Sequence, residues 1–149
     1  MASIGTNSTQ TVTPIDTTIY AVQVTDTFGC IAVDSVIVNV NPIPSVTTSA
    51  NLTYCAGDLV PTSTYTSVPT GSTYNWFHTN TAIGLTPANG TSNTPGFTAT
   101  NLILSPDTTT ISVIPELNGC YGDTIDYLIV VNPTPSANIL PSILLENHL

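Results

Sequence analysis

The sequence predicts an all-β protein built from β-sandwich repeats, and three observations support this prediction. Hydrophobic residues make up 41% of the 149 residues, which is far from the low hydrophobicity of disordered chains. Thr supplies roughly a fifth of the chain, and most apolar residues are Val, Ile, Leu and Tyr. Because β-branched and aromatic side chains suit a pleated, half-buried surface, this composition favours strands. The third observation is a set of landmarks that recurs after about ninety residues.

The recurring segments lie at residues 14–45 and 106–136. Each segment has an Asp-Thr-Thr turn, an alternating strand, a Gly-Cys pair, a second strand and two spaced prolines. The matching landmarks are Asp16 with Asp107, Gly29-Cys30 with Gly119-Cys120, and Asn41-Pro42-x-Pro44 with Asn132-Pro133-x-Pro135. Proline ends strand pairing because it has no N–H to donate. Each copy is therefore predicted to be the closing hairpin of a sandwich domain, followed by a stiff joint.

This period predicts three parts in the chain. Residues 1–43 are expected to be the end of a truncated repeat, residues 44–134 a complete repeat, and residues 135–149 the start of the next one, with 145–149 as a candidate vector-derived end. The expected strands of the complete repeat are Ser45–Thr48, Asp58–Val60, Ser63–Thr66, Thr73–Phe77, Gly96–Thr100, Thr109–Ile114 and Thr124–Val131. About seven short strands in ninety residues match an immunoglobulin-like sandwich. The predicted fold is thus a tandem array of such sandwiches.

The charge balance excludes several partners. The chain has no Lys or Arg and nine acidic residues, for a formal net charge of −9. Nucleic acids and anionic membrane surfaces are both bound through cationic side chains, so neither is an expected partner. No apolar run reaches the 18 or so residues of a membrane-spanning helix. A chain without trypsin cleavage sites suits an extracellular surface.

Three cysteines invite a prediction about disulfides. Cys55 and Cys120 belong to the same repeat and are expected to be bonded, which would stabilise the fold by roughly 4 kcal/mol. Cys30 stands at the position of Cys120 in the truncated repeat, so its partner is expected upstream. Three buried free thiols are the alternative. A metal site on the cysteines is not expected, because the chain has no Cys-x-x-Cys pair.

The chain has few candidate catalytic or metal-binding residues, and we expect no enzyme activity. The acidic residues are spread through turns and strand ends, and the histidines are His78, expected in a surface loop, and His148 near the end of the chain. Asp58 and Asp123 follow the two paired cysteines and are candidate calcium ligands if the disulfide brings them together. No other cofactor is expected.

An aromatic pair, Tyr74 and Trp76, lies on one face of an expected strand. An exposed pair could stack on sugar rings. In sandwiches, however, the Trp of this strand packs in the core, so both residues are predicted core residues.

The pattern resembles the PKD-like and immunoglobulin-like repeats of large cell-surface adhesins from gliding Bacteroidota-type bacteria. The residues that carry the resemblance are Tyr20–Asp26, Gly29-Cys30, Tyr74-Asn75-Trp76, Gly119-Cys120 and the two Asn-Pro-x-Pro joints. One departure is Phe77-His78-Thr79-Asn80, where PKD domains have a Gly-Asp-Gly turn. The resemblance also implies O-glycosylation at Asp-Thr/Ser triplets, with candidate acceptors Thr17, Ser35, Thr108 and Thr124.

These observations predict a structural or adhesive module of a long secreted adhesin or filament, acting in surface attachment or gliding motility. The alternative is an extracellular module that binds carbohydrate, such as a surface polysaccharide, or another partner. Neighbouring repeats are the expected partners, and strand edges without Lys invite self-association into filaments. In particular, the tail of one chain (residues 135–149) could supply a strand to the truncated repeat of another.

Overall fold

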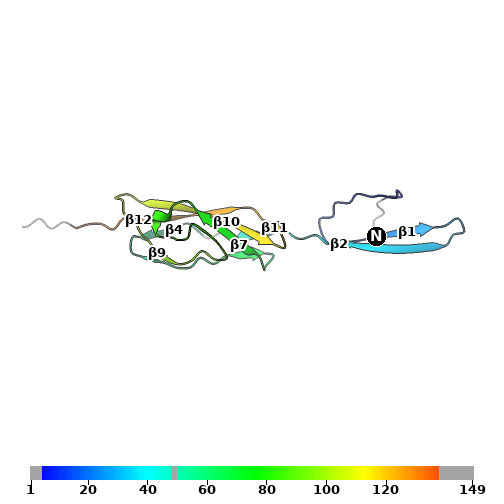
Figure 1. Ribbon diagram of the computed structural model, residues 1–149, viewed down its shortest axis with the longest axis horizontal. Helices are drawn as coiled ribbons and strands as arrows, with labels where there is room; N and C mark the ends of the chain where they lie inside the picture. The colour runs from blue at the N-terminus through cyan, green and yellow to red at the C-terminus, as the bar shows by residue number, and fades with distance from the viewer. Residues whose placement is uncertain (1–4, 48–49, 138–149) are drawn as a thin grey trace, which may run out of the picture.

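The computed structural model describes residues 5–47 and 50–137, and every strand in it belongs to a β-sheet (Figure 1). A two-stranded hairpin lies at one end of the long axis, and a larger body of packed sheets lies at the other. Residues 39–44 join the two parts. The all-β class is confirmed, and the larger body is compatible with a β-sandwich.

The hairpin pairs β1 (Thr18–Thr25) with β2 (Ile31–Val38) along the full length of both strands. Its turn is closed by Asp26, whose carboxylate accepts the backbone N–H groups of Phe28 and Cys30, both at 2.8 Å. These bonds, with that of Cys30 the largest contribution, hold the pKa of Asp26 below its usual value. Gly29 completes the turn with a φ of 87°, a conformation that glycine adopts without strain.

The main sheet of the larger body has the strand order β4–β12–β10–β7–β8. Only β4 and β12 are parallel, and the other neighbours are antiparallel. The strands are β4 (Leu52–Cys55), β7 (Thr73–His78), β8 (Asn89–Thr91), β10 (Asp107–Leu117) and β12 (Ile125–Asn132), and a short β11 (Cys120–Tyr121) extends the β10 edge. Along β10 the residues from Thr109 to Pro115 alternate between buried and more exposed positions, because successive side chains point to opposite faces.

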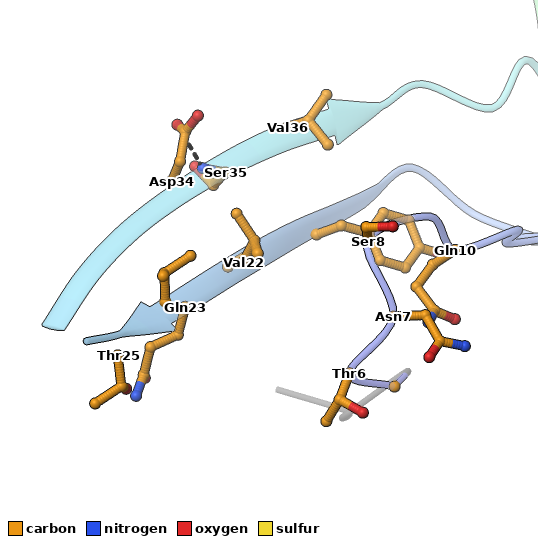
Figure 2. A pocket seen from close by; sticks show the side chains of 14 residues that line it. Thr6, Asn7, Ser8, Gln10, Val22, Gln23, Thr25, Asp34, Ser35 and Val36 are labelled. Atoms are coloured by element: carbon orange, nitrogen blue, oxygen red, sulfur yellow. Dashed lines mark hydrogen bonds between the residues drawn. The ribbon is translucent and has the colours of Figure 1, made fainter. Parts of the chain in front are cut away.

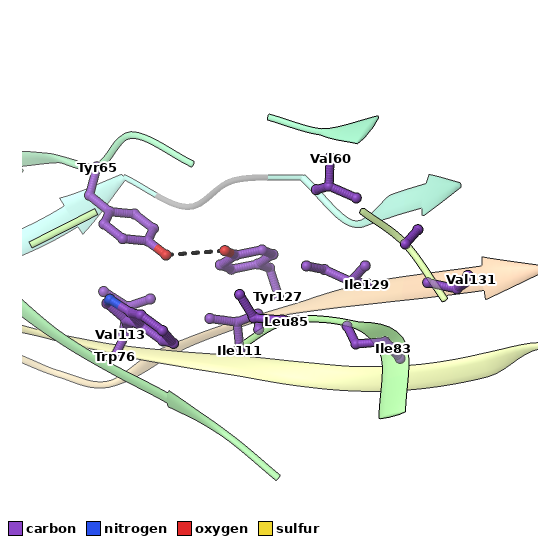
Figure 3. Close-up of a cluster of buried hydrophobic side chains, with 11 residues drawn as sticks. Val60, Tyr65, Trp76, Ile83, Leu85, Ile111, Val113, Tyr127, Ile129 and Val131 are labelled. Atoms are coloured by element: carbon purple, nitrogen blue, oxygen red, sulfur yellow. Dashed lines mark hydrogen bonds between the residues drawn. The ribbon is translucent and has the colours of Figure 1, made fainter. Parts of the chain in front are cut away.

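A second layer of short strands covers one face of this sheet. It consists of β3 (Ser45–Thr47) with β6 (Thr66–Val68), and β5 (Leu59–Val60) with β9 (Phe97–Thr98). A single-turn 3-10 helix, η1 (Thr81–Ile83), follows β7. Figure 3 shows the core between the layers, where Val60 and Tyr65 face Trp76, Ile111 and Tyr127. No helix among the described residues has the length and apolar character needed to cross a bilayer.

The joint between hairpin and body is held at two points. The side-chain amide of Asn41 donates to the carbonyl oxygen of Asn118, in the turn after β10, at 3.3 Å. Pro44 is buried, and its carbonyl oxygen lies so close to Gly122 that a Cβ there would come within 1.9 Å. The joint therefore contacts the sandwich at both Asn118 and Gly122. These contacts restrict the orientation of the hairpin relative to the sandwich.

Candidate docking surface

The hairpins β1–β2 and β10–β12 have the same pairing register. A shift of 91 residues, which places Asp16 on Asp107 and Asn41 on Asn132, carries the pairs of one hairpin onto those of the other. The corresponding pairs are Thr18–Val38 with Thr109–Ile129, Tyr20–Val36 with Ile111–Tyr127, and Val22–Asp34 with Val113–Ile125. We call the side of β1–β2 that carries Thr18, Tyr20, Val22, Val36 and Val38 the hairpin face. It corresponds to the side of β10–β12 that faces the core.

The two equivalent faces differ sharply in burial. Val113 is 0% exposed and Tyr127 is 2% exposed in the core of the larger body. Their counterparts on the hairpin face, Val22 and Val36, are 57% and 60% exposed. An isolated two-stranded hairpin is at best marginally stable in water, whereas three or more strands with a covered apolar face can be stable. The hairpin face therefore has the composition of a core without the second layer of a core.

The strand edges differ in the same way. In the larger body β12 pairs with β4 and β10 pairs with β7, so both outer edges of that hairpin are covered. Within the described residues, β1 and β2 pair only with each other. Unpaired edges are templates for the addition of another strand.

A cleft of about 990 Å³ opens on the hairpin face (Figure 2). One wall is formed by β1 and β2, with Val22 and Val36, and the other by the polar N-terminal segment around Asn7 and Gln10. The carboxylate of Asp34 accepts the backbone N–H of Ser35 at 2.8 Å. The cleft thus combines an apolar strand surface with amide, hydroxyl and carboxylate groups.

The predicted disulfide between Cys55 and Cys120 is wrong. Cys55 pairs with Asn132 at the end of β12, whereas Cys120 lies in β11, before β12 begins. The eight residues of β12 span roughly 25 Å. A disulfide needs Cα atoms about 4.4–6.8 Å apart. All three cysteines are free thiols, and Cys30 and Cys55 are exposed.

The calcium pair fails for the same reason. Asp58 follows Cys55 and accepts the backbone N–H of that residue at 2.8 Å, which closes a turn, while Asp123 lies at the opposite end of the main sheet. Across residues 5–47 and 50–137, no group of three or more His, Cys, Asp or Glu side chains could hold a metal ion. Asp58 and Asp123 therefore do not form the predicted site.

The aromatic pair lies in the interior. Trp76 is 3% exposed within the core cluster, and Tyr74 is half-buried against that cluster. Gly90 in β8 makes room for the indole, since a Cβ there would lie 2.8 Å from Trp76 Cζ2. A buried indole cannot stack on a sugar ring, so Tyr74 and Trp76 are not an exposed sugar-binding pair, and their prediction as core residues is confirmed.

His78 is not in a surface loop, and that prediction is wrong. It ends β7, is 5% exposed and stacks on Trp76 with ring centroids 6.3 Å apart. Its Nδ1 lies 3.1 Å from the carbonyl oxygen of Asn80, and its Nε2 lies 3.4 Å from that of Pro87. The signal in the sequence was the two-residue spacing from Trp76, which places both rings on one face of the strand.

A buried cluster of hydroxyl groups escaped the sequence analysis. The Tyr65 hydroxyl bonds Thr94, lies 3.1 Å from the Tyr127 hydroxyl, and Tyr127 in turn donates to Ser63 at 3.2 Å. Burial raises the pKa of Tyr65 above its usual value. The cluster bridges the two layers through satisfied polar contacts.

The four candidate glycosylation residues are all exposed: Thr17, Ser35, Thr108 and Thr124. Thr17 Oγ1 also accepts the backbone N–H of Val40 at 3.2 Å.

The chain matches no protein-family model and no curated protein.

Proposed function

We propose that this chain is a structural module of a long extracellular adhesin or filament, built from tandem immunoglobulin-like, PKD-like sandwich repeats of the Bacteroidota type. In this proposal it serves surface attachment or gliding motility and has no catalytic role. One observation carries the proposal: the β1–β2 and β10–β12 hairpins share one pairing register across a shift of 91 residues. Two hairpins with matching landmarks and matching joints are what a repeat array requires.

The joint supports a spacer role. Pro42 and Pro44 fix the backbone between hairpin and sandwich, and Asn41 binds the turn at Asn118. An array that must hold an adhesive end away from a surface needs joints of this stiff kind. The composition of the chain supports an exposed location, because nine acidic residues and no cations keep it soluble and give trypsin no cleavage site.

Small-angle X-ray scattering of the full chain, extrapolated to zero concentration, tests the spacer role. A stiff joint predicts the scattering of one extended particle, and the double variant Pro42→Gly/Pro44→Gly should broaden the distribution of dimensions. Identical, broad distributions for both proteins would contradict the proposal.

A glycan-array screen of the same protein tests the competing carbohydrate-binding role. Because Trp76 is buried, we expect no saturable binding. Saturable binding to one class of polysaccharide would replace the structural proposal with the binding one.

A further inference from the structure

Two asparagine–glycine pairs occur in the chain, Asn89-Gly90 and Asn118-Gly119. Asparagine before glycine is the dipeptide most prone to deamidation, because glycine has no Cβ to shield its backbone nitrogen or to restrict its rotation. In this reaction the backbone nitrogen of the glycine attacks Cγ of the asparagine. The nitrogen must therefore be free of other bonds, and the backbone must be able to rotate. The structure places the two pairs in opposite environments.

The Asn89-Gly90 pair is held in the main sheet. Gly90 lies opposite Trp76 in the β7–β8 ladder. Backbone bonds donated by His78 and Ser92, two residues away on either side, put this pair at a hydrogen-bonded position, because hydrogen-bonded and non-hydrogen-bonded pairs alternate. The indole also packs against Gly90, since a Cβ there would lie 2.8 Å from Trp76 Cζ2. The N–H of Gly90 is therefore engaged in the ladder, and the pair cannot rotate unless β8 opens.

The Asn118-Gly119 pair is the two-residue turn between β10 and β11. Leu117 pairs with Cys120 across it, and φ is 51° at Asn118 and 80° at Gly119, as in a type I′ turn. Both turn residues are exposed, and a Cβ built on Gly119 would meet nothing within 4 Å. Within the described residues the N–H of Gly119 donates no hydrogen bond. This nitrogen is available for reaction, and the turn can rotate while the strands beside it stay paired.

We propose that Asn118 is a site of spontaneous deamidation through a succinimide. The Gly119 nitrogen gives its proton to a base in the solvent and forms a bond to Cγ of Asn118. The bond from Cγ to the side-chain nitrogen breaks, and that nitrogen takes up a proton and leaves as ammonia. Water then opens the ring at either of its carbonyl groups, which gives aspartate or isoaspartate. Either product adds one negative charge to the formal net charge of −9.

The site lies where the joint contacts the sandwich. The backbone carbonyl oxygen of Asn118 accepts the side-chain amide of Asn41 at 3.3 Å. In isoaspartate the main chain runs through the former side chain, so one methylene carbon is added to the turn and the former carbonyl becomes a free carboxylate. A two-residue turn fixes the register of its strands and has no room for an added backbone atom. Isoaspartate therefore moves this group away from Asn41 and loosens the joint, whereas aspartate keeps the backbone and the contact.

Native and urea-unfolded samples of the full chain, aged in the same mildly alkaline buffer, test the site. Mass spectrometry after pepsin digestion in acid, where the reaction is slow, locates each deamidated residue, and enzymatic methylation identifies isoaspartate. In the native protein Asn118 should react at least about tenfold faster than Asn89, a ratio that about 1.4 kcal/mol of opening free energy for β8 provides. In urea the two residues should react at similar rates.

Two results would overturn the site. One is an equal rate at Asn89 and Asn118 in the native protein. The other is a native Asn118 that keeps its amide under conditions that convert both residues in urea. Both comparisons use the unmodified sequence, so no variant has to fold for the test to work.

Small-angle X-ray scattering of the purified products tests the effect on the joint. The isoaspartate form should show a broader distribution of dimensions than the unaged protein. Asn118→Asp is the matched control, because it adds the same charge on an unlengthened backbone and Asp tolerates a positive φ. This variant should scatter like the unaged protein. An isoaspartate form as narrow as the unaged protein, or an Asn118→Asp variant as broad as the isoaspartate form, would refute the loosening of the joint by the longer backbone.

Discussion

Val113 and Val22 occupy equivalent positions in the two hairpins, which makes them a matched pair for testing what burial contributes. Val113 in β10 is fully buried, and Val22 in β1 is more than half exposed. Replacing valine by alanine removes two methyl-sized groups at about 0.8 kcal/mol each when they are buried. The cavity left behind adds to that, so Val113→Ala should lower the free energy of unfolding by about 2–3 kcal/mol. Val22→Ala should change it by less than about 0.5 kcal/mol, as exposed substitutions do.

Urea unfolding followed by Trp76 fluorescence measures the effect of Val113→Ala, because the chain has one tryptophan and it lies in the sandwich core. Far-UV circular dichroism of the same samples also reports on the β1–β2 hairpin and measures the effect of Val22→Ala. The measurement belongs at concentrations where the protein is monomeric, so that no second copy covers Val22. If Val22→Ala lowered the free energy of unfolding as much as Val113→Ala does, the hairpin face would have to be buried in the monomer. The argument for a docking surface would then collapse.

Three further predictions follow from the interior and the thiols. Gly90→Ala should destabilise the sandwich by about 1–3 kcal/mol in urea unfolding, because the new Cβ meets the Trp76 ring, while Asn89→Ala beside it should be nearly neutral. The fold disfavours the phenolate of Tyr65, so its contribution to stability is fully present below pH 10 and is lost as the pH rises through the higher pKa of the folded state. Unfolding midpoints should therefore fall above pH 10, and fall less steeply in Tyr65→Phe. Thiol titration of the unreduced protein should find three free thiols per chain, and a count of one would restore the disulfide.

Much of the strand pattern could be predicted because alternation and turn residues are local signals. The segments Thr73–Phe77 and Thr124–Val131 match β7 and β12 to within one residue at each end, and Thr109–Ile114 lies inside the longer β10. Here, β-branched residues alternate along strands that cross the core, so pattern and burial agree.

The strands β4, β8 and β11 were missed, and the expected strand Ser63–Thr66 overlaps β6 only at Thr66. For β4 and β8 the reason is that their signal is not local. β4 is four residues long, and it is a strand because β12 lies beside it in parallel, a contact between segments about eighty residues apart. β8 reads Asn-Gly-Thr, a sequence typical of a turn, and its glycine is required by the ring of Trp76. Neither partner is visible from the segment itself.

The candidate site residues failed for a related reason. Cys55 and Cys120 share a local context, each followed by Gly and Asp two and three residues later, and that likeness suggested a pair. Local context reports only the neighbouring residues, and even the turns differ here, because Cys55 precedes the turn at Ala56-Gly57 whereas Cys120 follows the turn at Asn118-Gly119. Local context does not report at which end of the sheet a turn lies. Cys55 lies beside the end of β12, whereas Cys120 comes before β12 begins, and this separation rules out the disulfide. It follows from the order and direction of the strands in the sheet.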